Sequence, residues 1–320
     1  MRDKKRIEWV DFLKGLGILL VVYGHVILGV HDAKIGFTGI DYHLQSSFIY
    51  TLHMPLFFFL SGLFAEKWAQ RSISVAFKQK ALTLLVPYFI WGIIQGTIMT
   101  ILSSVTNNSI SWNNILLLPI KPFAQFWFLY DLFFIFIFYY LLKRVTNNNF
   151  ILVIAIVLAI LSPILHIWEL WRISYHFIFF LLGTLFIRGK LYDKIKPVYI
   201  FPIFILFIII NIEYFILKSN SLINNINSII VALIGIGFVI SLSKIFKSNF
   251  IDYLGRLSLP IYLMHIMATA GSRIILIKIM HIDNIAINVI VGLLLGVSLP
   301  IIAYNILKKL KLNRYLFMEK

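Results

Sequence analysis

The chain has 320 residues, of which 60% are hydrophobic, 16% aromatic and 13% charged. A soluble globular domain carries about 45–50% apolar and about 25% charged residues, whereas apolar runs of about 20 residues recur here from Phe12 to Leu307. These values exclude a water-soluble enzyme, a DNA-binding protein and a disordered scaffold, and they predict an all-α, polytopic integral membrane protein in the lipid bilayer. In a membrane protein, the formal net charge of +16 reflects lysines and arginines that set the orientation of the spans. We therefore expect no nucleic-acid partner.

Cysteine is absent from the chain. The sequence therefore provides no disulfide, no thiolate metal ligand and no cysteine nucleophile. It also contains no HExxH motif, no paired-aspartate motif and no clustered His/Cys spacing. We predict no metal site on these grounds.

Ten membrane spans are predicted when each apolar stretch of about 17–25 residues is taken as one helix. The expected helices lie near residues 11–31, 45–65, 81–104, 125–142, 150–166, 173–188, 198–217, 226–246, 257–277 and 284–307. The fifth and sixth stretches are short, so counts of nine and eleven stay open. We expect one membrane-embedded domain over residues 1–320, with short basic tails at residues 1–8 and 308–320.

Basic residues predict how the spans are oriented. With the N-terminus in the cytoplasm, most of the lysines and arginines fall in cytoplasmic segments, as the positive-inside rule requires. Ten spans then place both termini in the cytoplasm, in a multi-pass protein of the cell membrane. The run after the basic residues 2–6 is long and lacks a small-residue cleavage site, so we expect an uncleaved first helix.

The first predicted span carries two ionisable side chains inside the bilayer. Lys14 and His25 lie eleven positions apart, which at about 100° per residue places both on one helix face, with about 16 Å of rise between them. An ionisable residue within a span is a functional-site hypothesis by default. The structural alternative is that Lys14 reaches the cytoplasmic headgroups and His25 bonds a neighbouring helix.

The second predicted span contains a histidine next to a proline. Pro55 lacks a backbone N–H and is expected to kink this helix. His53, two positions earlier, either contributes a titratable ring to a site or satisfies the backbone that Pro55 frees.

A basic cytoplasmic segment follows, with Arg71, Lys78 and Lys80. Several point charges at a membrane face suit the phosphates of a nucleotide-like ligand. The alternative is simple positive-inside topology, which is the commoner reason for any one such residue. The sequence contains no Gly-rich phosphate loop.

Two later spans carry further candidates. Trp127 and Asp131 begin the span at 125–142, and His265 lies in the span at 257–277. Trp127 is typical of an interfacial aromatic, whereas a buried Asp131 requires a partner and would orient or stabilise a histidine. His265 fits equally a packing role and a ligand contact.

Four segments together resemble the membrane-bound acyltransferase family 3, within it the branch of fucose 4-O-acetylase-like sugar acyltransferases. They are Asp11 to His25 (DFLKGLGILLVVYGH), Phe48 to Gly62, Trp127 to Leu129 and Ser258 to His265 (SLPIYLMH), in the family's order and across most of the chain. Many members carry arginine where this chain has Lys14. A second family pattern, two arginines three apart after the second span, is not matched cleanly.

The resemblance implies a ten-helix bundle that moves an acyl group, commonly acetyl from acetyl-CoA, to a hydroxyl of a cell-envelope or exported glycan. No cofactor would stay bound, because acyl-CoA is a co-substrate and a glycan or lipid-linked sugar is the acceptor. His25 would be the general base or, less directly, an acyl carrier, with Lys14 and Asp131 in the catalytic group. Contacts with donor and substrate would fall to His53, Arg71, Lys78, Lys80, Trp127 and His265.

Two other functions fit the same composition. A flippase or exporter of a lipid-linked or polymeric glycan would use buried His and Asp residues as a proton relay, although the paired broken helices typical of such transporters are not evident. A membrane subunit that holds partner enzymes would explain the hydrophobicity but not the aligned Lys14 and His25. The identity of the acyl group, the acceptor hydroxyl and the oligomeric state stay open.

Overall fold

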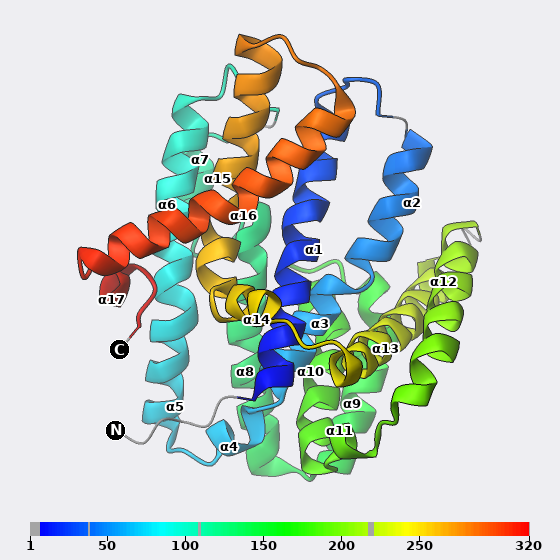
Figure 1. Ribbon diagram of the computed structural model, residues 1–320. Coiled ribbons are helices and arrows are strands. Elements are labelled where there is room, and N and C mark those ends of the chain that lie inside the picture. Colours follow the sequence, from blue (N-terminus) through cyan, green and yellow to red (C-terminus); the bar gives the residue numbers. More distant parts are fainter. Residues whose placement is uncertain (1–6, 38, 108–109, 217–220, 320) are drawn as a thin grey trace. The chain divides into compact units, whose positions relative to one another are not determined.

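The computed structural model describes residues 7–37, 39–107, 110–216 and 221–319, and every regular element in them is a helix (Figure 1). The longer helices are α1 (Glu8–Asp32), α2 (Gly39–Tyr50), α3 (His53–Gly62), α5 (Ile73–Lys80), α6 (Val86–Ile101), α8 (Trp127–Val145), α9 (Asn148–Leu161), α10 (Leu170–Arg188), α12 (Ile200–Ile216), α13 (Ser221–Ile245), α14 (Asn249–Arg256), α15 (Ser258–Ile274) and α16 (Ile285–Lys309). Shorter elements are α4 (Ala65–Ala69), α7 (Trp112–Leu116), α11 (Leu191–Lys194), α17 (Asn313–Leu316) and the 3₁₀- or π-helical turns η1 (Ala81–Leu85), η2 (Ala124–Phe126), η3 (Ser162–Ile164), η4 (Pro197–Tyr199) and η5 (Ile275–Ile279). The predicted all-α class is confirmed. Residues 1–6 of the predicted basic tail lie outside the described residues.

Eight helical stretches in the described part of the chain are long and apolar enough to cross a membrane. They are Glu8–Asp32, Ile73–Ile101, Ala124–Val145, Leu170–Arg188, Pro197–Ile216, Leu222–Ile245, Ser258–Ile279 and Ile285–Lys309. The polytopic membrane class is thus supported by length and composition. The orientation of the spans, with both termini in the cytoplasm, stays a prediction.

The other two predicted spans are not single long helices. The stretch predicted at 45–65 is divided into α2 and α3 by a turn at Thr51 and Leu52. Pro55 explains the break, because its ring clashes with the carbonyl four residues earlier, that of Thr51, and it offers no N–H to bond. The stretch predicted at 150–166 forms α9, which has 14 residues, and then the turn η3 at Pro163. Fourteen helical residues rise about 21 Å, less than the hydrocarbon thickness of about 30 Å.

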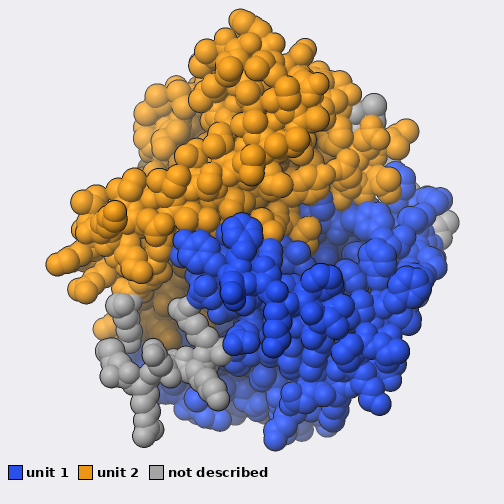
Figure 2. Space-filling view, in the orientation of Figure 1, with its two compact units in different colours: residues 1–18, 47–76, 134–258 blue, residues 19–46, 77–133, 259–320 orange. Residues whose placement is uncertain are grey.

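The chain forms two compact units, which Figure 2 shows in different colours. Unit 1 comprises Met1–Ile18, Ser47–Ala76 and Phe134–Ser258, and unit 2 comprises Leu19–Ser46, Phe77–Phe133 and Leu259–Lys320. Five helices contribute residues to both units, namely α1, α2, α5, α8 and, by its first residue Ser258, α15.

Unit 1 is built around α10, which packs on α3 and α9, while α12 lies along α13 (Figure 1). Glycines allow α3 and α10 to approach closely, because a Cβ at Gly62 would collide with the backbone of Phe180 and one at Gly183 with the backbone of Phe59. The Thr184 hydroxyl donates to the Gly62 carbonyl across this contact at 2.9 Å.

Unit 2 uses the same device where α16 meets α1 and α15. Gly292 and Gly296 are four residues apart, so they share one face of α16. A Cβ at Gly296 would stand 2.5 Å from Thr269 Cγ2 and 2.7 Å from Val22 Cγ1, and one at Gly292 would stand 3.1 Å from Val26 Cγ1. This GxxxG contact therefore fixes α16 against the parts of α1 and α15 that carry the site described next.

Candidate active site

Two histidines from distant parts of the sequence meet in unit 2. His25 is half-buried on α1, and its Nδ1 lies 3.3 Å from Nε2 of His265 on α15. The two rings are 4.9 Å apart between centroids and meet edge to face at 69°. The structure thus brings together two of the residues that the sequence singled out.

His265 is held firmly from its other side. Its side chain has no solvent exposure, and its Nδ1 lies 2.8 Å from the Tyr262 carbonyl oxygen and 3.1 Å from that of Ile261. A carbonyl oxygen only accepts hydrogen bonds, so Nδ1 of neutral His265 carries the proton. Its Nε2, which faces His25, then acts as an acceptor.

The same reasoning places the proton on His25. Its Nδ1 lies 2.9 Å from the Val21 carbonyl oxygen, so Nδ1 is the protonated nitrogen of the neutral ring. Its Nε2 therefore carries the lone pair, and within the described residues this atom forms no hydrogen bond. An unprotonated ring nitrogen on a partly exposed side chain is suited to a general base.

A buried amide pair supports the histidine pair. Gln95 on α6 and Gln125 in η2 exchange two hydrogen bonds of 3.1 and 2.8 Å, and both side chains are almost completely buried. The Tyr262 hydroxyl donates to the main-chain carbonyl oxygen of Gln125. This bond connects the amide pair to the turn of α15 that precedes His265. The sequence analysis missed both glutamines, because within the spans it considered ionisable and interfacial aromatic side chains. The signal that could have found them is an uncharged amide side chain within an apolar stretch.

Two more tyrosines hold the segment before η2. The Tyr88 hydroxyl donates to the Leu118 carbonyl oxygen at 2.6 Å, and the Tyr130 hydroxyl donates to that of Pro119 at 2.9 Å. Because these carbonyls lie in turns without helical partners, the hydroxyls satisfy groups that are costly to bury unpaired. Residues 117–126 are thereby fixed within unit 2.

The remaining predicted residues of unit 2 lie on α8 and α5. Asp131 is completely buried, and Trp127 is half-buried as the first residue of α8. In the same turn of α8, the Phe128 ring is 5.6 Å from that of Tyr262. Lys78 is exposed and Lys80 half-buried in the last turn of α5.

Unit 1 contains the other three predicted residues, Lys14, His53 and Arg71. Lys14 is half-buried on α1. His53 is buried with its Nδ1 2.6 Å from the Ile49 carbonyl oxygen, beside the break that Pro55 imposes. The Ile49 carbonyl is not the one that Pro55 frees, which belongs to Thr51, so both roles weighed for His53 stay predictions.

Arg71 lies between α4 and α5, and its backbone is well anchored. Its carbonyl oxygen accepts hydrogen bonds of 3.0 Å from the Tyr140 hydroxyl and of 3.0 Å from Arg144 Nη2. The half-exposed Arg71 therefore starts the basic segment from a fixed position in unit 1.

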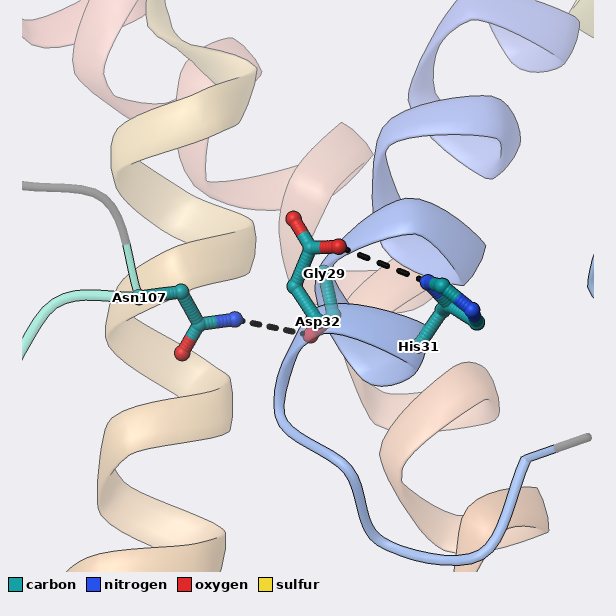
Figure 3. Close-up of polar contacts among 4 residues, drawn as sticks. All are labelled: Gly29, His31, Asp32 and Asn107. Atoms are coloured by element: carbon teal, nitrogen blue, oxygen red, sulfur yellow. Dashed lines mark hydrogen bonds and ion pairs between the residues drawn. The ribbon is translucent and has the colours of Figure 1, made fainter. Parts of the chain in front are cut away.

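A polar and aromatic cluster lies at the C-terminal end of α1 in unit 2, and Figure 3 shows the polar contacts of His31, Asp32 and Asn107 in it. We call it the distal cluster, and it consists of His31, Asp32, Tyr42, His43 and Asn107. His31 Nδ1 lies 3.4 Å from Asp32 Oδ1, the His31 and Tyr42 rings stack at 4.2 Å, and Tyr42 and His43 are 5.2 Å apart between centroids. Asn107 Nδ2 donates to the Gly29 carbonyl at 3.0 Å.

The distal cluster offers both donors and acceptors to a polar ligand. Burial, and then the negative charge of Asp32, raise the pKa of the Tyr42 phenol, so it stays a neutral donor at pH 7. His31 is six residues beyond His25, about 9 Å along the helix. The sequence analysis did not single this cluster out, although residues 31–43 are rich in His, Asp and Tyr. Among the described residues, no group of three or more His, Cys, Asp or Glu side chains is placed to hold a metal ion.

The fold and the histidine pair define a polytopic, all-helical membrane protein with a site suited to proton transfer. The chain belongs to the acyltransferase 3 family, because the family profile described as an acyltransferase domain matches residues 7–305. Comparisons with curated proteins and with solved structures find no match. The family match covers both histidines and implies acyltransferase activity in a membrane; the branch proposed from the sequence stays a prediction.

Proposed function

We propose that the chain is an O-acyltransferase that moves an acyl group, commonly acetyl, from acyl-CoA to a hydroxyl of a cell-envelope or exported glycan, with His25 as general base. The family match supports acyl transfer. The observation that carries the role of His25 is the contact of its Nδ1 with a second imidazole, that of His265, at 3.3 Å on a partly exposed side chain, which leaves Nε2 as the basic atom.

In the proposed reaction His25 Nε2 takes the proton of the acceptor hydroxyl while that oxygen attacks the thioester carbonyl carbon. A C–O bond forms, and the carbonyl electrons move onto oxygen. When this intermediate collapses the C–S bond breaks, and the CoA thiolate leaves with the proton from the His25 imidazolium. The products are an ester and free CoA thiol, so atoms and charge balance without an additional reactant.

The donor is proposed to enter from the predicted cytoplasmic side. Lys78 and Lys80 lie in the last turn of α5, where Lys78 is exposed and Lys80 is partly exposed, and they are proposed to bind the phosphates of the donor. Arg71 is proposed to add a third positive charge. Lys14, eleven positions before His25 on α1, is proposed to counter the donor's charge or the oxyanion that develops.

The acceptor is proposed to bind at the distal cluster, on the predicted outer side. Hydroxyl-rich sugars combine polar edges with apolar ring faces, and the cluster supplies a carboxylate, an amide and a stacked aromatic pair. Asp32 and Asn107 would hydrogen-bond hydroxyls while Tyr42 contacts a ring face. The cluster follows His25 along α1, and it is proposed to form the entrance to the base.

The first test is transfer from radiolabelled acetyl-CoA to a membrane glycan extract by purified protein in liposomes. We expect labelled glycan with the wild type and a loss of about 10²- to 10⁴-fold with His25→Ala. His166→Ala is the matched control, because His166 is exposed in a loop of unit 1, and it should transfer like the wild type.

Two results would contradict the proposal. Full transfer by folded His25→Ala would remove His25 from the role of base. No transfer and no thioester hydrolysis by the wild type with a panel of acyl donors would contradict acyl transfer, and a glycan-flipping assay would then test the transport function instead.

A further inference from the structure

The contact with His265 fixes the tautomer of His25 and also the position of its ring relative to α15. The Val21 carbonyl alone would place the proton on His25 Nδ1. The Nε2 of His265 is a second acceptor for that same proton, 3.3 Å away and on a different helix. A bond to its own helix orients the ring locally, whereas a bond to α15 also fixes the position of α1 at His25.

The second acceptor becomes more important when His25 gains a proton. His25 is then a cation, and a hydrogen bond from a charged donor is roughly twice as strong as a neutral one. Because the bond to His265 strengthens as the acceptor hydroxyl gives up its proton, it stabilises the transition state more than the ground state. Such an interaction raises kcat rather than substrate binding.

His265 is suited to this part because it is itself immobile. Its Nδ1 is directed to the carbonyls of Ile261 and Tyr262, and Tyr262 is bonded to Gln125. One turn later on α15, Thr269 packs against Gly296 of α16. Three separate contacts therefore hold the acceptor nitrogen in place.

We propose that His265 is a positioning residue, which accepts the Nδ1 proton of His25, fixes the ring of that base and stabilises its protonated form. This proposal rests on the proposed function of His25, and it differs from the substrate contact that the sequence suggested for His265. No contact between His265 and a substrate is required.

The test compares His265→Gln with His265→Leu. Glutamine keeps an oxygen acceptor near the position of Nε2, whereas leucine fills similar space without one. We expect kcat of the leucine variant to fall about 10- to 100-fold, as when other residues that orient an active group are lost, with unchanged KM for acyl-CoA and acceptor. Glutamine should restore kcat to within several-fold of the wild type.

A purely packing role predicts the reverse order, because leucine suits a completely buried position better than glutamine. Equal or higher kcat in the leucine variant, or a change confined to KM, would overturn the proposal. If wild type transfers no acyl group, the proposed function fails, and the spectroscopic test below still decides the contact.

NMR of the His25 ring nitrogens tests the contact directly and does not depend on the activity of the variants. In ¹⁵N-histidine-labelled wild type, NMR should show His25 protonated at Nδ1, with that proton shifted downfield by its hydrogen bonds; the signal is assigned by its loss in His25→Gln. His265→Gln should keep this shift and His265→Leu should move it upfield. An Nε2-protonated His25, or a proton signal unaffected by either variant, would overturn the contact itself.

Discussion

Each unit contains two helical histidines, His53 and His176 in unit 1 and His25 and His265 in unit 2, and all four rings share one local contact. The Nδ1 atoms of His53, His176, His25 and His265 lie 2.6, 2.8, 2.9 and 3.1 Å from the carbonyl oxygen four residues earlier in the chain. This contact is a consequence of helical geometry and by itself does not indicate function.

The two pairs differ in what else each ring meets. In unit 1 the His176 ring stacks on that of Phe58 at 4.3 Å and the side chain is buried; His53, also buried, has Tyr50 at 5.0 Å. In unit 2 His25 is half-exposed and its Nδ1 faces another imidazole. The comparison teaches that side-chain exposure distinguishes a candidate base from a packed histidine, because His25 is partly exposed whereas His53 and His176 are buried.

The sharpest test of this difference is His25→Gln, which keeps a polar side chain but no base. We expect turnover to fall about 10²- to 10⁴-fold while the thermal unfolding midpoint stays within a few degrees, because glutamine keeps a polar side chain at this partly buried position. Transfer kinetics and melting curves of the same preparation measure both. A large fall in the melting temperature with normal turnover of the folded fraction would place His25 with the packed histidines.

Lys14 lies in unit 1 but on the same helix, α1, as His25 of unit 2. Its substitution tests whether a residue of unit 1 contributes to turnover. Lys14→Gln should lower kcat/KM roughly 100-fold if the charge stabilises an oxyanion, and Lys14→Arg should recover most of it because the charge is kept. The exposed Lys247 supplies the control Lys247→Gln. Equal rates for the glutamine and arginine variants would show that the charge of residue 14 is irrelevant.

Gly296→Ala tests whether the helix contact in unit 2 supports its histidine pair. The added Cβ would meet Thr269 and Val22, so we expect a loss of about 1–3 kcal/mol in stability and a several-fold loss of turnover. Gly237→Ala is matched to it, since nothing lies within 4 Å of a Cβ there, and alanine is the better helix former. Identical melting temperatures for the two variants would contradict the close contact.

Tyr42→Ala addresses the distal cluster that accompanies the half-exposed histidine. Loss of an aromatic contact worth about 0.5–1.5 kcal/mol should raise KM for the glycan acceptor roughly 2- to 10-fold, with kcat and KM for acyl-CoA unchanged. The exposed Tyr199 of unit 1 gives the control Tyr199→Ala. Initial rates at varied acceptor concentration measure the KM for the acceptor. A change in the KM for acyl-CoA alone would contradict acceptor binding at the distal cluster.

His176→Leu should have the smallest effect on turnover. It removes the contacts to the Arg172 carbonyl and to the Phe58 ring, so we expect a loss of about 1–3 kcal/mol in stability and normal transfer per folded molecule. Melting curves and active-fraction kinetics measure the two quantities. Lost turnover in a stably folded variant would break the distinction between the two units.

Much of the membrane architecture follows from the sequence, because the bilayer makes length and hydropathy decisive for each segment alone. Eight predicted spans appear as helical stretches of sufficient length. The second predicted span is not one helix. From Pro55 the sequence predicted a kink, whereas the structure divides the stretch into the separate helices α2 and α3. The fifth ends early at Pro163 for the same reason.

The sequence by itself determined the class of protein, its family resemblance and the placement of ionisable residues in spans, because each depends on local composition or on order along the chain. Only the tertiary structure decided which histidine meets which. His25 and His265 are 240 residues apart, and no helical period relates them. Likewise the Gln95–Gln125 pair joins two helical elements through side chains. Contacts between helices depend on packing, which apolar patterning restricts but does not specify.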